Sequence, residues 1–344
     1  MASPVRAVLV GCGGMSRSWT RVSKESNQIE LVGFVDINEA AARARAEDYG
    51  VAGPTGTDLD KMLDAVTPDA VFDCTIPEVH TPVALQAFSH GCHVLSEKPM
   101  SDSMENAYKA ARAASTADRI YAIIQNRRYD SNIRRLSRTL RDRTIGDLTT
   151  LNCDFYIGAH FEGFRNHMPH VLLLDMAIHT FDAARLITGA DPVSVYCKEW
   201  NPAGSWYDRD ASAVAIFEMT GGIVYTYRGS WCSEGLNTTW ECDWRIIGEK
   251  GSITWNGADE FQGHKVVKTE AFLSDFEEFQ VAAPDTADRI GGHQGLILDF
   301  VDCIQNGGTP ETSYTDNIKS LAMAFGAIES AEAGKAVSIQ VQGS

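Results

Sequence analysis

Short apolar runs alternate with amphipathic segments over roughly the first 125 residues. The apolar runs have the length of buried strands and lie at 5–10, 31–35, 70–74, 93–96 and 121–124. Segments with helix-like spacing lie between them, at 38–49, 59–65, 81–89 and 103–115. Unbroken apolar strands that alternate with helices predict a parallel sheet covered on both faces. Ligands of such a sheet bind beyond the carboxyl ends of its strands, where the strand order reverses.

The pattern changes after about residue 125. Helices are indicated by the spacing at 133–142, 170–188, 295–305 and 316–333, the second of them bounded by Pro169 and Gly189. Strands are indicated at 148–156, 193–199, 211–218, 223–230, 239–247, 252–255 and 336–341, several of them aromatic and alternating. This alternation predicts a mostly antiparallel sheet with one packed and one open face. We therefore expect an α/β protein with two domains, a doubly wound parallel sheet in residues 1–124 and a second, mostly antiparallel sheet in residues 125–344.

A glycine-rich turn, Gly11-Cys12-Gly13-Gly14-Met15-Ser16, follows the first apolar run. Gly11 allows a tight turn and Gly13 lets a pyrophosphate approach the backbone at the start of the next helix. Ser16 takes the place of the third glycine of G-x-G-x-x-G and is small enough to pack there. The alternative is an ordinary strand–helix turn, but the acid that follows favours a dinucleotide site.

Asp36 ends the second apolar run, 20 residues after Ser16, where a carboxylate can bind the ribose hydroxyls of NAD. Its charge would repel the 2′-phosphate of NADP, and neither Ile37 nor Asn38 offers a cation to offset that repulsion. The sequence therefore predicts NAD as the cofactor, in preference to NADP.

Composition excludes several classes of protein. The formal net charge of −16 argues against nucleic acid and anionic membranes as partners. No apolar run approaches the roughly 20 residues that span a bilayer, and the start of the chain lacks the regions of a signal peptide. The eight cysteines include no C-x-x-C pair, as expected of buried thiols in a reducing compartment. We expect a cytoplasmic protein that binds no membrane.

Two clusters of polar residues carry candidate chemistry. Glu97-Lys98-Pro99 follows the run at 93–96, so Lys98 is expected at the ligand-binding edge of the parallel sheet; a solvated ion pair is the alternative. Asp175 and His179 are four residues apart in an apolar helix, which predicts one shared face; a satisfied core pair is the alternative.

Histidines are frequent near Asp175, which raises the question of a metal. His160, His167, His170 and His179 all lie within this part of the chain. The sequence contains no H-E-x-x-H, and an Asp-x-x-x-His pair supplies only half of a zinc site. We therefore expect no catalytic metal.

Together, these motifs resemble the glucose-fructose oxidoreductase and inositol dehydrogenase family, also called Gfo/Idh/MocA. The likeness rests on the glycine turn, Asp36, Glu97-Lys98-Pro99 and the Asp175/His179 pair, and it covers nearly the whole chain. Thr75-Ile76-Pro77 with His80 resembles the family's cofactor loop, and Asn126-Arg127-Arg128-Tyr129 resembles its entry to the second domain.

The resemblance implies a Rossmann domain followed by a domain for substrate binding and oligomerisation. It implies NAD or NADP, a cis Lys98–Pro99 bond, and a catalytic group of Lys98, Asp175 and His179. The cofactor-binding set that we expect is Gly11, Gly13, Gly14, Met15, Ser16, Asp36, Ile37, Asn38, Thr75, Ile76, Pro77, His80, Glu97, Lys98 and Asn126. The substrate-binding set that we expect is Lys98, Arg128, Tyr156, Arg165, His167, Asp175, His179, Trp206 and His293.

The implied activity is oxidation of a secondary hydroxyl of a sugar, glycoside or cyclitol. Hydride would go to the nicotinamide and the proton to Lys98 or His179, a choice that the sequence leaves open. Six of the seven tryptophans lie between residues 200 and 255, and Trp206 could stack on a sugar. The alternatives are NAD retained through a closed redox cycle and, less favoured, a non-catalytic sensor. The aromatic second sheet predicts a homodimer or homotetramer.

Overall fold

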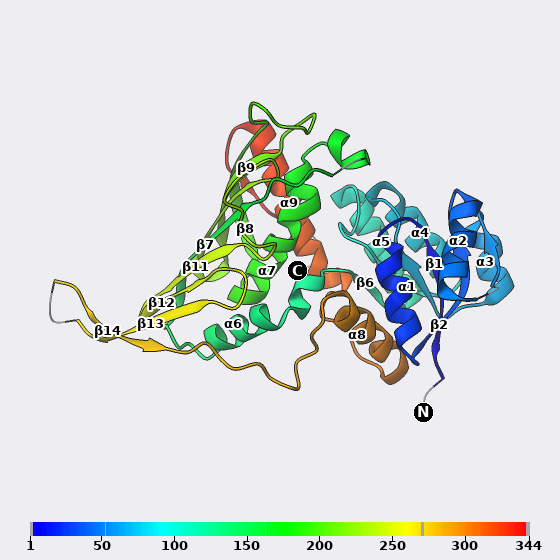
Figure 1. Cartoon of the computed structure of the whole chain (residues 1–344), viewed down its shortest axis with the longest axis horizontal. Coiled ribbons are helices and arrows are strands. Elements are labelled where there is room, and N and C mark those ends of the chain that lie inside the picture. Colours follow the sequence, from blue (N-terminus) through cyan, green and yellow to red (C-terminus); the bar gives the residue numbers. More distant parts are fainter. Residues whose placement is uncertain (1–2, 52, 162, 270–271, 342–344) are drawn as a thin grey trace. The chain divides into compact units, whose positions relative to one another are not determined.

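The computed structural model describes residues 3–51, 53–161, 163–269 and 272–341, drawn in Figure 1. They divide into two compact units. The first comprises residues up to Tyr129 together with Arg289–Ile318, and the second comprises Asp130–Asp288 with residues from Lys319 onward.

This division differs from the single boundary expected after residue 124. Helix α8 (His293–Asn306) belongs to the first unit although it follows most of the second in sequence. Its residues Leu296, Ile297 and Phe300 are buried in one apolar cluster with residues of the first sheet. The ring of Phe300 lies edge-on to that of Phe72, with centroids 6.2 Å apart. Because this apolar face of α8 packs against the first sheet, the chain re-enters the first unit here. Periodicity shows that the helix has an apolar face, but it does not show which sheet that face covers.

A parallel sheet of six strands, counted over the described residues, forms the centre of the first unit. The strand order is β3-β2-β1-β4-β5-β6. The strands are β1 (Val5–Val10), β2 (Ile29–Val35), β3 (Thr55–Gly56), β4 (Ala70–Asp73), β5 (His93–Ser96) and β6 (Tyr121–Ile123). The predicted doubly wound sheet is confirmed, and the order reverses between β1 and β4, where such sheets bind their ligands.

Two layers of helices cover this sheet. The connecting helices are α1 (Ser16–Glu25), α2 (Glu39–Tyr49), α3 (Leu59–Val66), α4 (Pro77–Ser89) and α5 (Met104–Ala117). Helices α1, α2 and α8 pack in one layer, and α3, α4 and α5 in the other. Asn38, Asp58 and Ser103 cap α2, α3 and α5 through side-chain oxygens that accept backbone N–H groups of the first turn.

The second unit contains a nine-stranded sheet, again counted over the described residues, in the order β14-β13-β12-β11-β7-β10-β9-β8-β15. Its strands are β7 (Leu148–Tyr156), β8 (Pro192–Trp200), β9 (Ser212–Met219), β10 (Val224–Ser230), β11 (Asp243–Gly248), β12 (Gly251–Trp255), β13 (Phe261–Lys268), β14 (Asp275–Phe279) and β15 (Val337–Ser338). Neighbouring strands pair antiparallel except β10 with β7, which confirms a mixed, mostly antiparallel sheet.

One face of this second sheet carries helices α6 (Ser131–Arg141), α7 (Ile178–Thr188) and α9 (Tyr314–Ala333), the last from residue 319 onward (Figure 1). Side chains of β8 and β9 alternate accordingly. Val195 and Phe217 are buried toward the helices, whereas Tyr196 and Ile216, which lie opposite each other, are exposed on the open face.

Several strand predictions were wrong in extent. The strand predicted at 239–247 begins only at Asp243, because Thr239 organises a turn in which its hydroxyl accepts the backbone N–H of Glu241. The strand predicted at 336–341 contains only Val337 and Ser338. The hairpin of β13 and β14 was not predicted, because its exposed, polar strands lack a strong apolar alternation.

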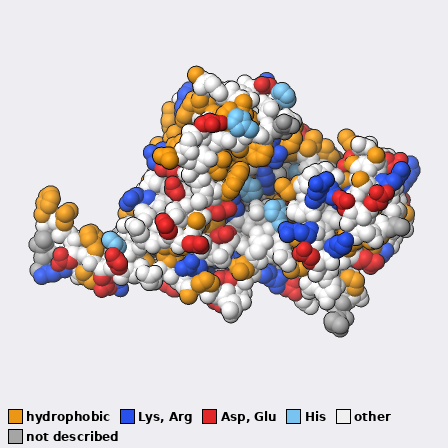
Figure 2. Space-filling view, in the orientation of Figure 1, with side chains coloured by type: hydrophobic (Ala, Val, Ile, Leu, Met, Phe, Trp, Pro, Cys, Tyr) orange, Lys and Arg blue, Asp and Glu red, His pale blue; other side chains and the backbone are white. Residues whose placement is uncertain are grey.

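Among the described residues, no helix combines the length and the apolar character needed to cross a membrane. On the face drawn in Figure 2, Lys and Arg side chains are interspersed with Asp and Glu over the surface.

The turn after β1 is the most constrained connection of the first unit. Gly11 adopts φ +84°, and a Cβ placed on it would lie 2.6 Å from the carbonyl oxygen of Cys74, the residue that follows β4. Gly13 lies two residues further on, where an added Cβ would meet no atom within 4 Å.

We therefore predict that Gly11→Ala lowers the free energy of unfolding by at least about 2 kcal/mol, because left-handed strain and the clash with Cys74 add. Gly13→Ala, the matched control, should change it by no more than about 0.5 kcal/mol. Urea unfolding followed by circular dichroism measures both. Equal stability of the two variants would contradict this account of the turn.

Candidate active site

The start of α1 provides backbone donors beside the glycine turn. Met15 precedes the helix and makes no side-chain capping bond, so the first N–H groups of α1 are not capped by that side chain. Space beside Gly13 and Gly14 is open to 4 Å. Open space at an uncapped helix N-terminus is what a dinucleotide pyrophosphate needs. These residues therefore fit the predicted cofactor, and a Cβ on Gly13 would fill part of the space.

Asp36 holds the same turn from the end of β2. Its Oδ2 accepts the backbone N–H of Cys12 at 2.7 Å, and its Oδ1 accepts that of Asn38 at 2.8 Å. Each carboxylate oxygen can accept a second hydrogen bond, so a ribose diol can still be bound. The neighbouring Ile37 is 98% exposed and offers no charge. Asp36 thus fixes the turn and remains available to a ribose.

Arg45 was missed by the sequence argument and explains why serine fits at position 16. The Nε of Arg45 donates to Oγ of Ser16 at 2.9 Å, and its Nη2 donates to the carbonyl of Gly13 at 3.0 Å. The Ser16 hydroxyl in turn donates to the Gly13 carbonyl at 2.7 Å. The buried guanidinium also pairs with Asp48. The sequence signal that could have indicated this role is an arginine placed among the alanines of α2.

The end of β4 carries a buried polar cluster centred on Asp73. His80 Nδ1 lies 2.8 Å from Asp73 Oδ2, and the Thr75 hydroxyl donates to Oδ1 at 2.6 Å. Burial alone would raise the pKa of Asp73, but His80, and after it Thr75, reverse that effect and the pKa is lowered.

His80 was predicted to bind the cofactor, and this prediction needs correction. Its side chain is completely buried against Asp73 and presents no surface to a ligand. It therefore positions the loop. Thr75 is partly buried and Ile76 and Pro77 follow it at the start of α4, where they remain candidates for cofactor contact.

Lys98 follows β5 at the same edge of the sheet as the glycine turn, Asp36 and Thr75. Its side chain is partly buried, and the Lys98–Pro99 peptide bond is cis, as the resemblance implied. Glu97 beside it is buried and accepts the indole N–H of Trp19 at 2.9 Å. Glu97 was predicted to contact the cofactor, but its carboxylate is buried inside the first unit and hydrogen-bonds to Trp19.

Three further predicted residues occupy the first unit. Arg128 is buried and forms an ion pair of 2.5 Å with Asp316, so its guanidinium is held within the protein; the predicted substrate contact is not supported. Asn126, at the start of η1 (Asn126–Tyr129), is partly buried. His293 begins α8 and lies 3.8 Å from Glu97, so it belongs to the first unit, whereas we placed it in the second.

Asp175 and His179 lie in the second unit, but the continuous α-helix predicted for them is wrong. The helix starts as a π-helix, η3 (Leu172–Ala177), and becomes α-helical at α7. Asp175 lies inside the π-helical turn and His179 follows in the first turn of α7. The shared face expected from about 3.6 residues per turn therefore does not hold across this junction. Such π-helical turns are frequent at functional sites.

Arg165 pairs directly with Asp175. From η2 (Gly163–His167), its Nε donates to Oδ2 of Asp175 at 2.7 Å and its Nη2 to Oδ1 at 3.3 Å. The guanidinium also lies over the rings of Phe161 and Phe164, at 5.1 and 4.9 Å from their centroids. A forked, charge-assisted pair of this kind orients the carboxylate. The sequence placed Arg165 in the substrate set but did not predict this pairing.

The same unit contains two further aromatic residues, Trp206 and Tyr207, and Tyr207 interacts electrostatically with both members of the Arg165–Asp175 pair. Trp206 stacks on His160 with ring centroids 3.7 Å apart and donates its indole N–H to the carbonyl of Ala159. Burial raises the pKa of the neighbouring Tyr207 to about 12, and Asp175 contributes to the rise. Tyr207 therefore remains a neutral phenol at physiological pH.

His167 and Tyr156, also predicted to bind the substrate, differ in exposure. His167 is exposed and pairs with Asp208 at 2.5 Å. Tyr156 ends β7 and is partly buried, and burial, with Asp154, raises its pKa.

Comparison with known proteins matches both halves of the chain. Residues 5–125 match the family described as "Oxidoreductase family, NAD-binding Rossmann fold", and residues 133–254 match the "GFO/IDH/MocA C-terminal domain". An inositol 2-dehydrogenase of Arthrobacter sp. (strain FB24) is 29% identical over 198 residues, which cover 57% of each chain. A 1,5-anhydro-D-fructose reductase of Ensifer adhaerens is 21% identical, covering 96% of this chain and 98% of the relative.

Among solved structures, an oxidoreductase from Agrobacterium radiobacter, crystallised with NAD⁺, L-tartaric acid and magnesium, is similar in fold. Its TM-score is 0.85 at 19% identity, and the match covers 97% of this chain and 98% of that one. The family matches, the strand order of the first sheet and the glycine turn agree with one another. The chain is a member of the GFO/IDH/MocA oxidoreductase family, with an NAD-binding Rossmann fold in its first unit.

Proposed function

We propose that this protein is an NAD-dependent dehydrogenase that oxidises a secondary hydroxyl of a sugar, glycoside or cyclitol. The observation that carries the proposal is the position of Lys98 after β5, at the sheet edge that also holds the glycine turn and Asp36. An amine at this edge lies where ligands of such sheets bind. The relatives named as inositol 2-dehydrogenase and 1,5-anhydro-D-fructose reductase support a polyhydroxylated substrate.

A nicotinamide bound beside the glycine turn would supply the hydride acceptor. The residues of the chain must then bind the hydroxyls, orient the carbon and take the proton. Lys98 polarises the substrate oxygen or takes its proton. Asp175, oriented by Arg165, accepts hydrogen bonds from hydroxyls, and His179 binds a hydroxyl or takes the proton. The aromatic surface of Phe164 and Trp206 suits the C–H faces of a sugar ring.

Loss of Lys98 tests the catalytic assignment. Because acid–base catalysis contributes typically about 10²–10⁴-fold, Lys98→Ala should lower kcat by roughly that factor. His179→Ala should lower it as much if His179 takes the proton, and less if it only binds hydroxyls. Steady-state kinetics across a panel of sugars and cyclitols, with direct measurement of NAD binding, gives the readout.

Lys61→Ala is the control, because Lys61 is an exposed lysine that pairs with Asp58 in the same unit. Near-full turnover in both Lys98→Ala and His179→Ala would refute the assignment. Turnover without accumulation of NADH would instead indicate the closed redox cycle, and the absence of turnover on every substrate would favour the sensor.

The cofactor assignment has its own test. We predict a higher kcat/KM with NAD than with NADP, because the carboxylate of Asp36 repels a 2′-phosphate. We also predict that Gly13→Ala binds NAD at least tenfold more weakly, because the added methyl group fills the open space beside the turn. Titration of intrinsic fluorescence with NAD measures the affinity. Equal use of NADP would contradict the role of Asp36, and unchanged affinity of Gly13→Ala would contradict that of Gly13.

Assembly through the open face of the second sheet is also proposed. Tyr196, Trp200 and Ile216 are 45%, 40% and 43% exposed there, and apolar patches on monomers are usually small. We predict a dimer or tetramer by analytical ultracentrifugation and dissociation in Ile216→Lys. Val79→Lys, which changes an exposed valine of α4, is the control. A wild-type protein that sediments as a monomer at micromolar concentration would count against this interface.

A further inference from the structure

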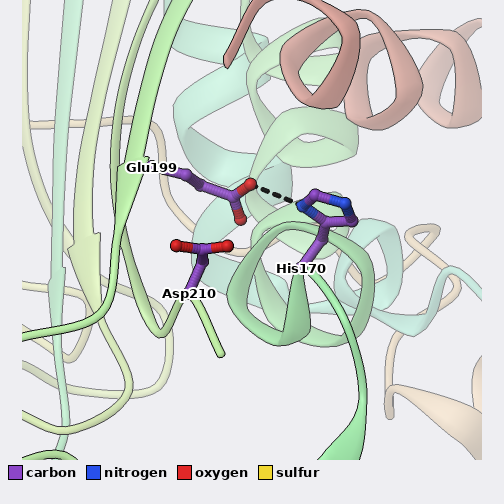
Figure 3. A group of neighbouring side chains, drawn as sticks. All are labelled: His170, Glu199 and Asp210. Atoms are coloured by element: carbon purple, nitrogen blue, oxygen red, sulfur yellow. Dashed lines mark hydrogen bonds and ion pairs between the residues drawn. The ribbon is translucent and has the colours of Figure 1, made fainter. Parts of the chain in front are cut away.

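Three ligand-type side chains converge in the second unit, apart from Asp175 and His179. Figure 3 shows His170, Glu199 and Asp210 together: His170 precedes η3, Glu199 lies on β8 and Asp210 lies in the loop before β9. Each offers one ligand atom, and these atoms lie within 4.8 Å of one another. Glu199 and Asp210 follow His170 by 29 and 40 residues, so no short sequence motif predicts the cluster.

Glu199 supplies the observation that points to a ligand. Its side chain is only 4% exposed, and His170 Nδ1 hydrogen-bonds with its Oε2 at 2.6 Å. Its other oxygen, Oε1, is buried and has no hydrogen-bond partner among the described residues. Figure 3 shows this oxygen directed toward the Asp210 carboxylate. A buried carboxylate oxygen without a donor is costly, so a cation between the two acids would satisfy it.

The charges around the cluster favour the same ligand. Asp210 faces Glu199, and Glu332 of α9 approaches Nε2 of His170 to 3.7 Å, so three carboxylates surround one imidazole. Burial raises the pKa of Glu199, against the lowering effect of His170. The hydrogen bond to Glu199 raises the pKa of His170, against burial. The cluster therefore contains three acidic side chains and one imidazole.

We propose that His170, Glu199 and Asp210 bind one divalent transition-metal ion, Zn²⁺ or Mn²⁺. A single imidazole with two carboxylates suits these ions, whereas Mg²⁺ and Ca²⁺ prefer oxygen ligands alone. Ligand atoms about 2.1 Å from one ion lie about 3 Å apart, so the 2.6 Å contact between His170 and Glu199 must open slightly as the metal replaces the proton.

The ion would connect β8, the loop before β9 and the segment that leads into η3. Asp175 lies five residues after His170, so the site would fix the start of the turn that carries it. This inference does not depend on the proposed function, because the three residues are separate from the proposed catalytic group.

The test is metal binding by the whole chain after treatment with a chelator and dialysis. Calorimetric titration with Zn²⁺ and, separately, Mn²⁺ should give one ion per chain and a raised melting temperature. Glu199→Gln and His170→Gln should each weaken binding at least tenfold. Glu278→Gln is the matched control, since Glu278 belongs to an exposed histidine–glutamate pair with His264, and it should bind as the wild type does.

Absence of stoichiometric binding by the wild type would overturn the proposal. So would equal binding by His170→Gln, or binding of Ca²⁺ in preference to both transition ions, because the imidazole would then not be a ligand. Circular dichroism establishes whether each variant folds. If Glu199→Gln does not fold, Asp210→Asn replaces it, since Asp210 lies in a loop and is partly exposed; unchanged affinity in that variant would equally overturn the site.

Discussion

The close packing of the turn after β1 against the chain that leaves β4 is the constraint on which the binding edge of the first unit depends. Gly11 leaves no room for a Cβ beside Cys74, and its N–H bonds to the carbonyl of Val35 at the end of β2. Three strand ends are thereby brought together. Asp36 then fixes Cys12, and Arg45 fixes Gly13 through Ser16, so the backbone of the turn is held before any ligand arrives. Preorganised donors of this kind lower the entropy that binding would otherwise cost.

Buried ionisable residues around this edge pair with other groups of the chain. Asp73 is held by His80 and Thr75, Glu97 by Trp19, and Arg128 by Asp316. A charge removed from water needs such partners, because desolvation otherwise favours the neutral form. The polar residues beside Lys98 in the fold, Asp73 and Glu97, are thus already paired with other side chains. The residues that fix the loops therefore differ largely from the candidates for ligand contact, although they are adjacent in sequence.

In the second unit, the corresponding constraint is the change of helix type between Asp175 and His179. The π-helical turn moves Asp175 away from the position that a regular α-helix would give it, and the guanidinium of Arg165 defines where its carboxylate points. Phe161 and Phe164 on the guanidinium limit its motion. The candidate site of this unit is therefore built by a short loop, one irregular turn and an aromatic surface.

The sequence alone determined the fold class and the family, because strand–helix alternation and short motifs are local in the chain. It also placed Gly11, Asp36 and Lys98 at the ends of strands, whereas the π-helical turn overturned the regular helix that it predicted for Asp175 and His179. Partners distant in sequence were decided by the tertiary structure. Arg45 meets Ser16 across 29 residues, Glu97 meets Trp19 across 78, and α8 returns to the first unit. The buried states of His80 and Arg128 likewise depend on which residues surround them. Periodicity reports which face of an element is apolar, but only packing decides what that face covers and which polar groups become paired.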